Sequence, residues 1–169
     1  MQRTTILQQV DIFDELSDRH LEKLASVCRE LTYNEVGKII FQENSPSDEL
    51  YIIAKGMVEI VVDPSLLGVG IPNSPGPTTV ATLRRGQTFG EVGLVDRGLR
   101  SASARVATKR TQLLAISRKD LLQLCREDYE LGYLLMRNIA SDLAFKIRNT
   151  DLMVREQLFW KPRVQDQMG

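Results

Sequence analysis

Apolar residues between positions 36 and 116 come in short runs separated by turn residues, a pattern typical of strands joined by tight turns. These runs predict strands at residues 39–41, 50–54, 57–62, 78–83, 102–107 and 112–116. The segment from Asp63 to Pro77 contains four prolines and three glycines, so we expect an exposed loop there. Many short strands in succession predict an antiparallel roll or barrel.

Helical patterns flank the strands on both sides. Ser17 is a helix-capping residue followed by apolar residues at helical spacing, and we expect this helical pattern to continue as far as Leu31. Ser117 starts a second, short helix, and a long helix is expected over residues 129–160 because no proline interrupts it before Pro162. The predicted fold is α+β and mainly β: an antiparallel, jelly-roll-like β-roll with N-terminal helices and a long C-terminal helix.

The length of 169 residues suits one domain. We expect residues 1–128 to form the roll with its N-terminal helices, and residues 129–169 to add a hinge or dimerisation helix and a tail. With 43% hydrophobic and 26% charged residues, no transmembrane run and no signal-peptide core, the composition predicts a cytoplasmic globular protein. Cys28 and Cys125 lie among apolar residues, and we expect free core thiols.

Residue types suited to catalysis or metal binding are scarce. His20 is the only histidine, no nucleophile motif accompanies it, and it has no set of residues at metal-ligand spacing, so we expect a solvated side chain. The sequence contains no dinucleotide fingerprint, no Walker loop and no cysteine cluster of the kind that holds an iron–sulfur centre. We therefore expect no enzyme, no metal and no cofactor.

Charge is unevenly distributed along the chain. Residues 1–63 carry 12 acidic and 6 basic residues, a net charge of −6, whereas residues 84–119 carry 9 basic and 2 acidic residues, a net charge of +7. The asymmetry is too scattered to predict nucleic-acid binding, and most of these charges are expected on solvated faces.

One motif within the basic block combines groups that suit a phosphorylated sugar. It reads Phe-Gly-Glu-Val-Gly-Leu at residues 89–94 and continues with Arg-Ser-Ala at residues 100–102. Gly90 lets backbone N–H groups approach an anion, Glu91 can accept hydrogen bonds from sugar hydroxyls, and Arg100 offers a planar set of donors for a phosphate diester. The motif predicts a site for a small ligand with one phosphate charge and a ribose hydroxyl.

With this motif and this order of elements, the chain resembles the cyclic nucleotide-binding domain family, the type found in the catabolite activator protein and the regulatory subunit of protein kinase A. The resemblance covers roughly residues 5–160 and includes, before the motif, residues 7–13, the helix after Ser17, and residues 37–41, 48–53 and 55–56. It implies cAMP or cGMP as the ligand, and we favour cAMP. We refer to residues 89–102 as the cassette.

The resemblance implies ligand-binding roles for Gly90, Glu91, Val92, Arg100, Ser101 and Ala102. Gly90 and the residues after it would open a short helical turn whose N–H groups face the cyclic phosphate. Glu91 would accept a hydrogen bond from the ribose 2′-hydroxyl, and Arg100 would neutralise a phosphate oxygen. The two residues after Arg100 would add a hydroxyl and a backbone N–H.

The implied base pocket comprises Ile60 and Val80 as apolar walls, with Lys146, Asn149 and Thr150 on the long helix. Two positions depart from the family pattern. Asn44 stands where the family usually has a glycine, and Lys146 and Ile147 replace hydroxyl side chains that would meet the base. The sequence leaves open how the base is read.

A competing interpretation is a degenerate member of the family that keeps the fold, binds no nucleotide and serves as a ligand-free dimerisation or docking module. For Glu91 the alternative role is a surface carboxylate paired with an arginine, and for Arg100 it is a solvated charge at a strand edge. The presence of Glu91, Arg100 and Ser101 together favours ligand binding. We expect Arg100 to contribute little to the stability of the ligand-free fold.

The long helix carries a heptad pattern formed by Met136, Ala140, Leu143, Ile147, Thr150, Val154 and Gln157. This pattern predicts a parallel homodimer through residues 136–157, while Leu135 and Ile139 can pack the helix onto its own roll. We expect the ligand to reposition this helix and so to signal to an unknown protein partner. About nine residues follow Trp160, too few for a DNA-reading module, so we expect no DNA-binding domain in this chain. The sequence leaves open whether the chain acts on a partner protein or is a fragment of a longer one.

Overall fold

The computed structural model describes residues 2–46, 48–63, 65, 76–96 and 98–159. Its helices are α1 (Arg3–Leu7), the 3-10 turn η1 (Asp11–Phe13), α2 (Asp18–Val27), α3 (Val92–Asp96), α4 (Arg118–Glu127) and α5 (Tyr129–Phe159). Its strands are β1 (Arg29–Tyr33), β2 (Ile39–Phe41), β3 (Glu49–Lys55), β4 (Met57–Val62), β5 (Thr78–Arg84), β6 (Thr88–Phe89), β7 (Ser103–Val106) and β8 (Thr111–Ser117).

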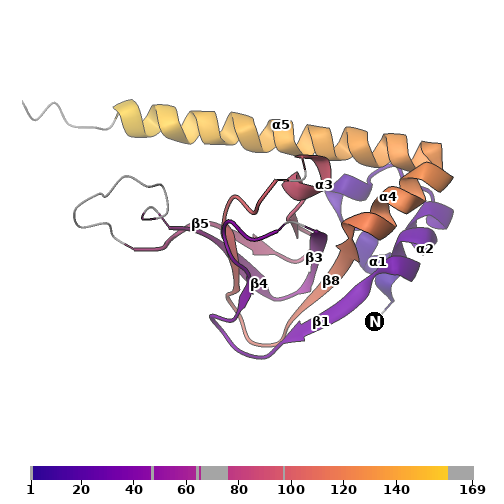
Figure 1. Ribbon diagram of the computed structural model, residues 1–169, viewed down its shortest axis with the longest axis horizontal. Coiled ribbons are helices and arrows are strands. Elements are labelled where there is room, and N and C mark those ends of the chain that lie inside the picture. The colour runs from indigo at the N-terminus through magenta and orange to yellow at the C-terminus, as the bar shows by residue number, and fades with distance from the viewer. Residues whose placement is uncertain (1, 47, 64, 66–75, 97, 160–169) are drawn as a thin grey trace, which may run out of the picture.

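Two antiparallel four-stranded sheets form the roll. One has the strand order β1-β8-β3-β6 and the other β2-β7-β4-β5. The predicted β-roll with flanking helices is therefore confirmed, and each of the six predicted strands has its counterpart. Figure 1 shows α5 lying along one side of the molecule, past α4 and α3, with its C-terminal half extending beyond them. Most of the predicted loop from Asp63 to Pro77 lies outside the described residues.

Strands β3 and β8 are buried on both faces, which explains their nearly continuous apolar sequences. Side chains alternate along each strand, so Leu50 and Ile52 of β3 face the helices while Tyr51 and Ile53 face the second sheet. The same alternation on β8 sends Leu114 to the helices and its neighbours into the roll. One sheet thus belongs to two hydrophobic cores at once.

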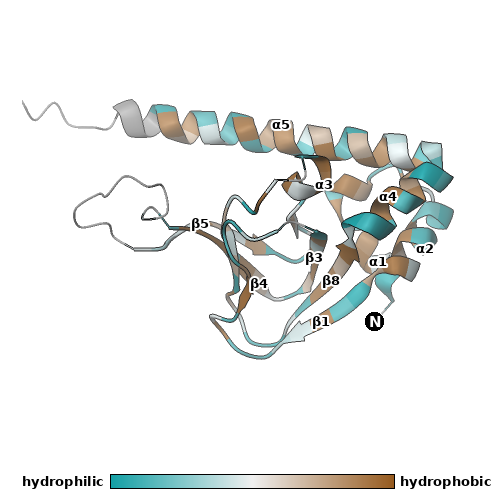
Figure 2. Cartoon of the chain, viewed as in Figure 1, coloured by the Kyte–Doolittle hydropathy of each residue, from teal (hydrophilic) through white to brown (hydrophobic). Residues whose placement is uncertain are grey.

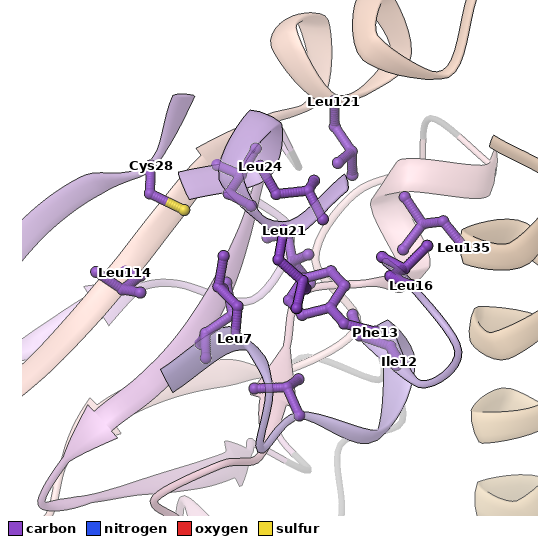
Figure 3. Close-up of a cluster of buried hydrophobic side chains, with 14 of the residues drawn as sticks. Leu7, Ile12, Phe13, Leu16, Leu21, Leu24, Cys28, Leu114, Leu121 and Leu135 are labelled. Atoms are coloured by element: carbon purple, nitrogen blue, oxygen red, sulfur yellow. The ribbon is translucent and has the colours of Figure 1, made fainter. Parts of the chain in front are cut away.

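The core under the helices joins the N-terminal segment to α5. Figure 3 shows its labelled members: Leu7, Ile12, Phe13, Leu16, Leu21, Leu24, Cys28, Leu114, Leu121 and Leu135. Leu131, Leu135 and Ile139 recur every four residues on α5 and are at most 1% exposed. This stripe fixes the N-terminal half of α5 on the body, as predicted for Leu135 and Ile139.

The segment after α2 was predicted as a continuation of the helix and is instead a strand. Ser17 caps α2 as expected, since its hydroxyl oxygen accepts a hydrogen bond from the backbone N–H of His20 over 3.3 Å. The helix ends at Val27, and β1 begins at Arg29 and pairs with β8. The prediction was wrong because a helical spacing of apolar residues does not exclude a strand: Cys28 joins the helical core, Leu31 packs against the core inside the roll, and β1 pairs with β8.

His20 is buried, at 5% exposure, so the prediction of a solvated side chain was also wrong. Its Nε2 atom lies 3.5 Å from Asp128 Oδ2, and Lys23 Nζ lies 2.6 Å from the same oxygen. The other oxygen of Asp128 accepts a hydrogen bond from the N–H of Leu131 in the first turn of α5. The Lys23 partner holds the pKa of Asp128 well below its usual range, at about 2. These contacts connect α2 to the junction of α4 and α5.

Both cysteines are free, as predicted. Cys28 is buried in the helical core, and burial raises the pKa of its thiol to about 11, while Cys125 is half-buried against the same core. None of the helices among the described residues is long and apolar enough to cross a membrane.

The turn between β3 and β4 provides a test of the roll's packing. Gly56 has φ +87°, and a Cβ there would lie 2.4 Å from Thr111 Oγ1 and 2.9 Å from Thr111 Cα. We expect Gly56→Ala to lower the free energy of unfolding by about 1–2 kcal/mol for the left-handed backbone and by about 1–3 kcal/mol more for the steric overlap. Urea denaturation measures this loss.

The matched control is Gly37→Ala, since Gly37 has φ +83° but open space around its Cβ position. This control isolates the backbone cost. Equal losses in the two variants would contradict the close approach of Gly56 to β8.

Candidate functional site

A cavity of about 450 Å³ is lined by residues of β2, β4, β5 and β6, by the cassette and by α5. Its apolar wall comes from Phe41 on β2, Ile60 on β4, Ala81 and Leu83 on β5, and Phe145 on α5. Its polar residues include Glu91, Arg100, Ser101 and Lys146. A volume of this size with a few convergent polar groups is typical of small-molecule sites.

Arg100 is one of two buried charged residues of the cavity, and like Glu91 it has only 5% of its surface exposed. Its guanidinium donates hydrogen bonds to the backbone oxygens of Gly90, over 3.3 Å, and Glu49, over 2.9 Å. It also lies 4.0 Å from the centroid of the Phe41 ring, a cation–π contact. Burial lowers the pKa of Arg100. These contacts do not fit the expectation that the ligand-free fold depends little on Arg100.

The Nε atom of Arg100 is buried and has no hydrogen-bond partner among the residues that the structure describes. An unpaired donor on a buried cation is costly, and a negatively charged acceptor in the cavity would remove that cost. The arginine is therefore held in place by two carbonyls, while its Nε–H has no acceptor among the described residues.

The backbone around Arg100 requires particular residues. Gly90 has φ +84°, and a Cβ there would lie 2.4 Å from Arg100 Nη1 and 2.8 Å from the Glu49 oxygen. Asn44, which stands at a usual glycine position, adopts φ +63°, and its N–H donates to the Arg100 carbonyl over 2.8 Å. Asparagine tolerates this left-handed conformation better than most residues do. The departure at Asn44 therefore leaves the turn in a glycine-like conformation.

Glu91 is buried, and it pairs with a lysine rather than with an arginine. Its side chain is 7% exposed, and its Oε1 atom accepts a hydrogen bond from Lys146 Nζ over 2.7 Å. The same ammonium lies 2.8 Å from Asp142 Oδ2, one turn earlier on α5. Burial lowers the pKa of Lys146, but Glu91 and Asp142 more than offset this, so that its pKa is raised.

The structure brings eight of the predicted site residues to the cavity: Gly90, Glu91, Val92, Arg100, Ser101, Ala102, Ile60 and Lys146. Val80 lies outside it. Ile60 pairs with Ala81 and Val61 with Thr79, so Val80 is the extra residue of a β-bulge, and its side chain is 55% exposed.

Asn149 and Thr150 also lie outside the cavity lining and are exposed. Thr150 donates its hydroxyl to the Lys146 carbonyl of its own helix over 2.9 Å. All residues from 147 to 155 are exposed, because α5 leaves the roll after Lys146. Of the three residues of α5 predicted for the base pocket, Lys146 is the one that lines the described cavity.

The sequence interpretation missed several lining residues. Phe41 lies under Arg100 and belongs to an aromatic group with Tyr51 and Phe89, whose ring centroids are 5.1 Å apart. Ala81 and Leu83 face the cavity in place of Val80. Ala81 lies opposite Ile60 on the neighbouring strand, so a regular pairing of the two strands would have indicated Ala81. The bulge at Val80 has no signal in the sequence.

Comparisons with known proteins find relatives of this chain in sequence and in fold. Residues 33–128 match the model of the cyclic nucleotide-binding domain. The chain is 35% identical over 141 residues to the cyclic AMP receptor protein of Thermus thermophilus, covering 83% of this chain and 59% of that protein, and 28% identical to a cGMP-dependent protein kinase of Drosophila melanogaster, covering 73% and 16%. The crystal structure of the Thermus thermophilus catabolite activator protein superposes with a TM-score of 0.71 at 32% identity, covering 88% and 63%. The chain thus spans less than two thirds of these relatives' lengths.

The contacts of Arg100 predict a structural cost for its removal in the absence of any ligand. Arg100→Ala leaves the carbonyls of Gly90 and Glu49 without their donors, and we expect the free energy of unfolding to fall by about 1–3 kcal/mol. Arg84→Ala, at an exposed position on β5, is the control, with an expected change within about 0.5 kcal/mol. Equal stabilities of the two variants in urea denaturation would contradict the bridging role of Arg100.

Proposed function

The chain belongs to the cyclic nucleotide-binding domain family, and on this basis we propose that it is a regulatory sensor that binds cAMP in the cavity beside the cassette. The unpaired Nε atom of Arg100 carries this proposal. A cyclic phosphate has a single negative charge, and it would give this buried donor the charged acceptor that it lacks.

The remaining polar groups suit the other parts of the ligand. Glu91 is placed on the same cavity as Arg100, and its carboxylate can accept a hydrogen bond from the ribose 2′-hydroxyl. Ser101 and Ala102 supply a hydroxyl and a backbone N–H beside the phosphate. The apolar wall of Ile60, Ala81 and Leu83 offers a surface for the base, with Phe145 and Lys146 on the other side.

The preference for cAMP over cGMP is the finer part of the proposal. The relative at 35% identity is a cyclic AMP receptor protein, and the one at 28% is a cGMP-dependent protein kinase, so the more similar relative supports cAMP.

The sensor role is non-enzymatic and cytoplasmic: ligand binding repositions α5 and changes the surface offered to a protein partner.

Calorimetry with cAMP, cGMP and adenosine tests ligand binding. We expect cAMP to bind with a free energy of about 7–10 kcal/mol, and Arg100→Gln to weaken this by about 2–4 kcal/mol because the phosphate loses its charged donor. Adenosine carries no phosphate, so its weak binding should not respond to Arg100→Gln. Circular dichroism at the temperature of the titration checks that the variant is folded.

Arg84→Gln is the control for a lost surface charge, and its affinity should equal that of the wild type. Absence of binding of either cyclic nucleotide at millimolar concentration would favour the ligand-free docking module. Equal cAMP affinities of Arg100→Gln and the wild type would remove Arg100 from the site.

The exposed half of α5 supports the second part of the proposal, a parallel homodimer through residues 136–157. Met136 and Leu143 at the start of the heptad pattern pack partly against the core, whereas Ile147 is 62% and Val154 is 49% exposed. Figure 2 shows hydrophobic and hydrophilic residues interleaved along α5 where it extends past α3. An apolar helix face that its own domain does not cover is suited to a second copy of the same helix.

Sedimentation of the ligand-free protein tests the dimer. At tens of micromolar we expect a dimer for the wild type and a monomer for Ile147→Glu, because the substitution places a charge in the centre of the apolar seam. Asn149→Glu introduces the same charge on the exposed surface next to the seam and should remain dimeric. A monomeric wild type would overturn the dimer.

A further inference from the structure

The ion pair between Lys146 and Glu91 joins α5 to the cassette across 55 positions of sequence. Lys146 donates to Glu91 Oε1 over 2.7 Å, and the Glu91 side chain is only 7% exposed. The carboxylate proposed to bind the ribose therefore has an ionic partner before any ligand arrives. A buried carboxylate that is already paired gains less from an added hydroxyl donor than an unpaired one does.

Lys146 has a second carboxylate within reach on its own helix. Asp142 Oδ2 lies 2.8 Å from the ammonium, at ion-pair distance, so Lys146 is paired with two carboxylates at once. A pair four residues apart on one helix stays intact when the helix moves as a body. Lys146 can therefore leave Glu91 and keep a compensating charge.

We propose that Lys146 competes with the sugar hydroxyl of the ligand for Glu91, so that nucleotide binding leaves Lys146 paired with Asp142 alone and releases α5 from the cassette; this inference rests on the proposed function. Two observations carry it. The buried carboxylate of Glu91 is paired with Lys146 from α5, and Asp142 offers Lys146 an alternative partner on its own helix.

The position of Lys146 on α5 gives the competition a structural consequence. Before it, Leu135 and Ile139 are buried and the Asn138 amide donates to the Asp14 carbonyl over 2.7 Å, so this half of the helix is fixed. After it, residues 147–155 are exposed. The pair with Glu91 thus lies at the boundary between the fixed and the projecting parts of α5, and its loss changes the constraint on the projecting part.

The test compares cAMP with 2′-deoxy-cAMP, which lacks the competing hydroxyl. The quantity measured is the dissociation constant of the deoxy ligand divided by that of cAMP, since this ratio cancels the effect of a lost charge on the phosphate. In Lys146→Met the ratio should rise about three- to tenfold, because Glu91 is left without its ionic partner. In Asp142→Asn it should fall below the wild-type value, because Lys146 has lost its alternative.

Arg148→Met removes one positive charge from an exposed position on α5 and should leave the ratio unchanged. A ratio in Lys146→Met that equals or falls below the wild-type value overturns the competition, as does a ratio in Asp142→Asn that equals or exceeds it. If Lys146→Met does not fold, the ratio of dissociation constants in Asp142→Asn decides the test. A wild type that binds neither cyclic nucleotide instead overturns the proposed function.

Discussion

The site depends on one buried cation, the guanidinium of Arg100. Burying a charge costs several kcal/mol unless polar groups compensate it, and here the backbone oxygens of Gly90 and Glu49 and the face of Phe41 do so. Because the Gly90 oxygen must approach the arginine, there is no room for a side chain at position 90. The backbone there is also left-handed, which favours glycine. The cassette, β2 and β3 are therefore arranged around a single side chain.

Glu49 shows how far this arrangement extends into the roll. Its backbone oxygen accepts from Arg100, while its carboxylate accepts from the Tyr51 hydroxyl over 2.7 Å and pairs with Arg29 of β1. Tyr51 also stacks on Phe89, the first residue of the cassette, with 5.1 Å between ring centroids. Arg100 is thus connected, through Glu49 and Tyr51, to β1, β3 and β6, which are far apart in the sequence.

The long helix is attached to the body in a graded way. Its first turns are fixed by the apolar stripe that includes Leu131 and by Asp128, whose carboxylate binds both the start of the helix and two residues of α2. Farther along, the ion pair with Glu91 replaces apolar packing. A helix held by packing at one end and by a single exchangeable ion pair near its middle is suited to respond to a ligand at that pair.

Much of the fold and part of the site could be predicted from the sequence, because they depend on local patterns. The short apolar runs predicted the strands, Ser17 and Ser117 predicted two helix starts, and the cassette predicted six residues that line one cavity. Where a local pattern fits two structures, the prediction was wrong: the residues after Val27 form β1, since β8 offers them a pairing partner.

The sequence alone determined which chemical groups lie together in the cassette, since those groups are neighbours in the chain and need only a turn to converge. Tertiary structure alone decided which groups face them: the burial of His20 against Asp128, the bulge that turns Val80 outward, and the partner of Glu91. Lys146 follows Glu91 by 55 residues, and only the packing of α5 against the roll brings the two charges to 2.7 Å.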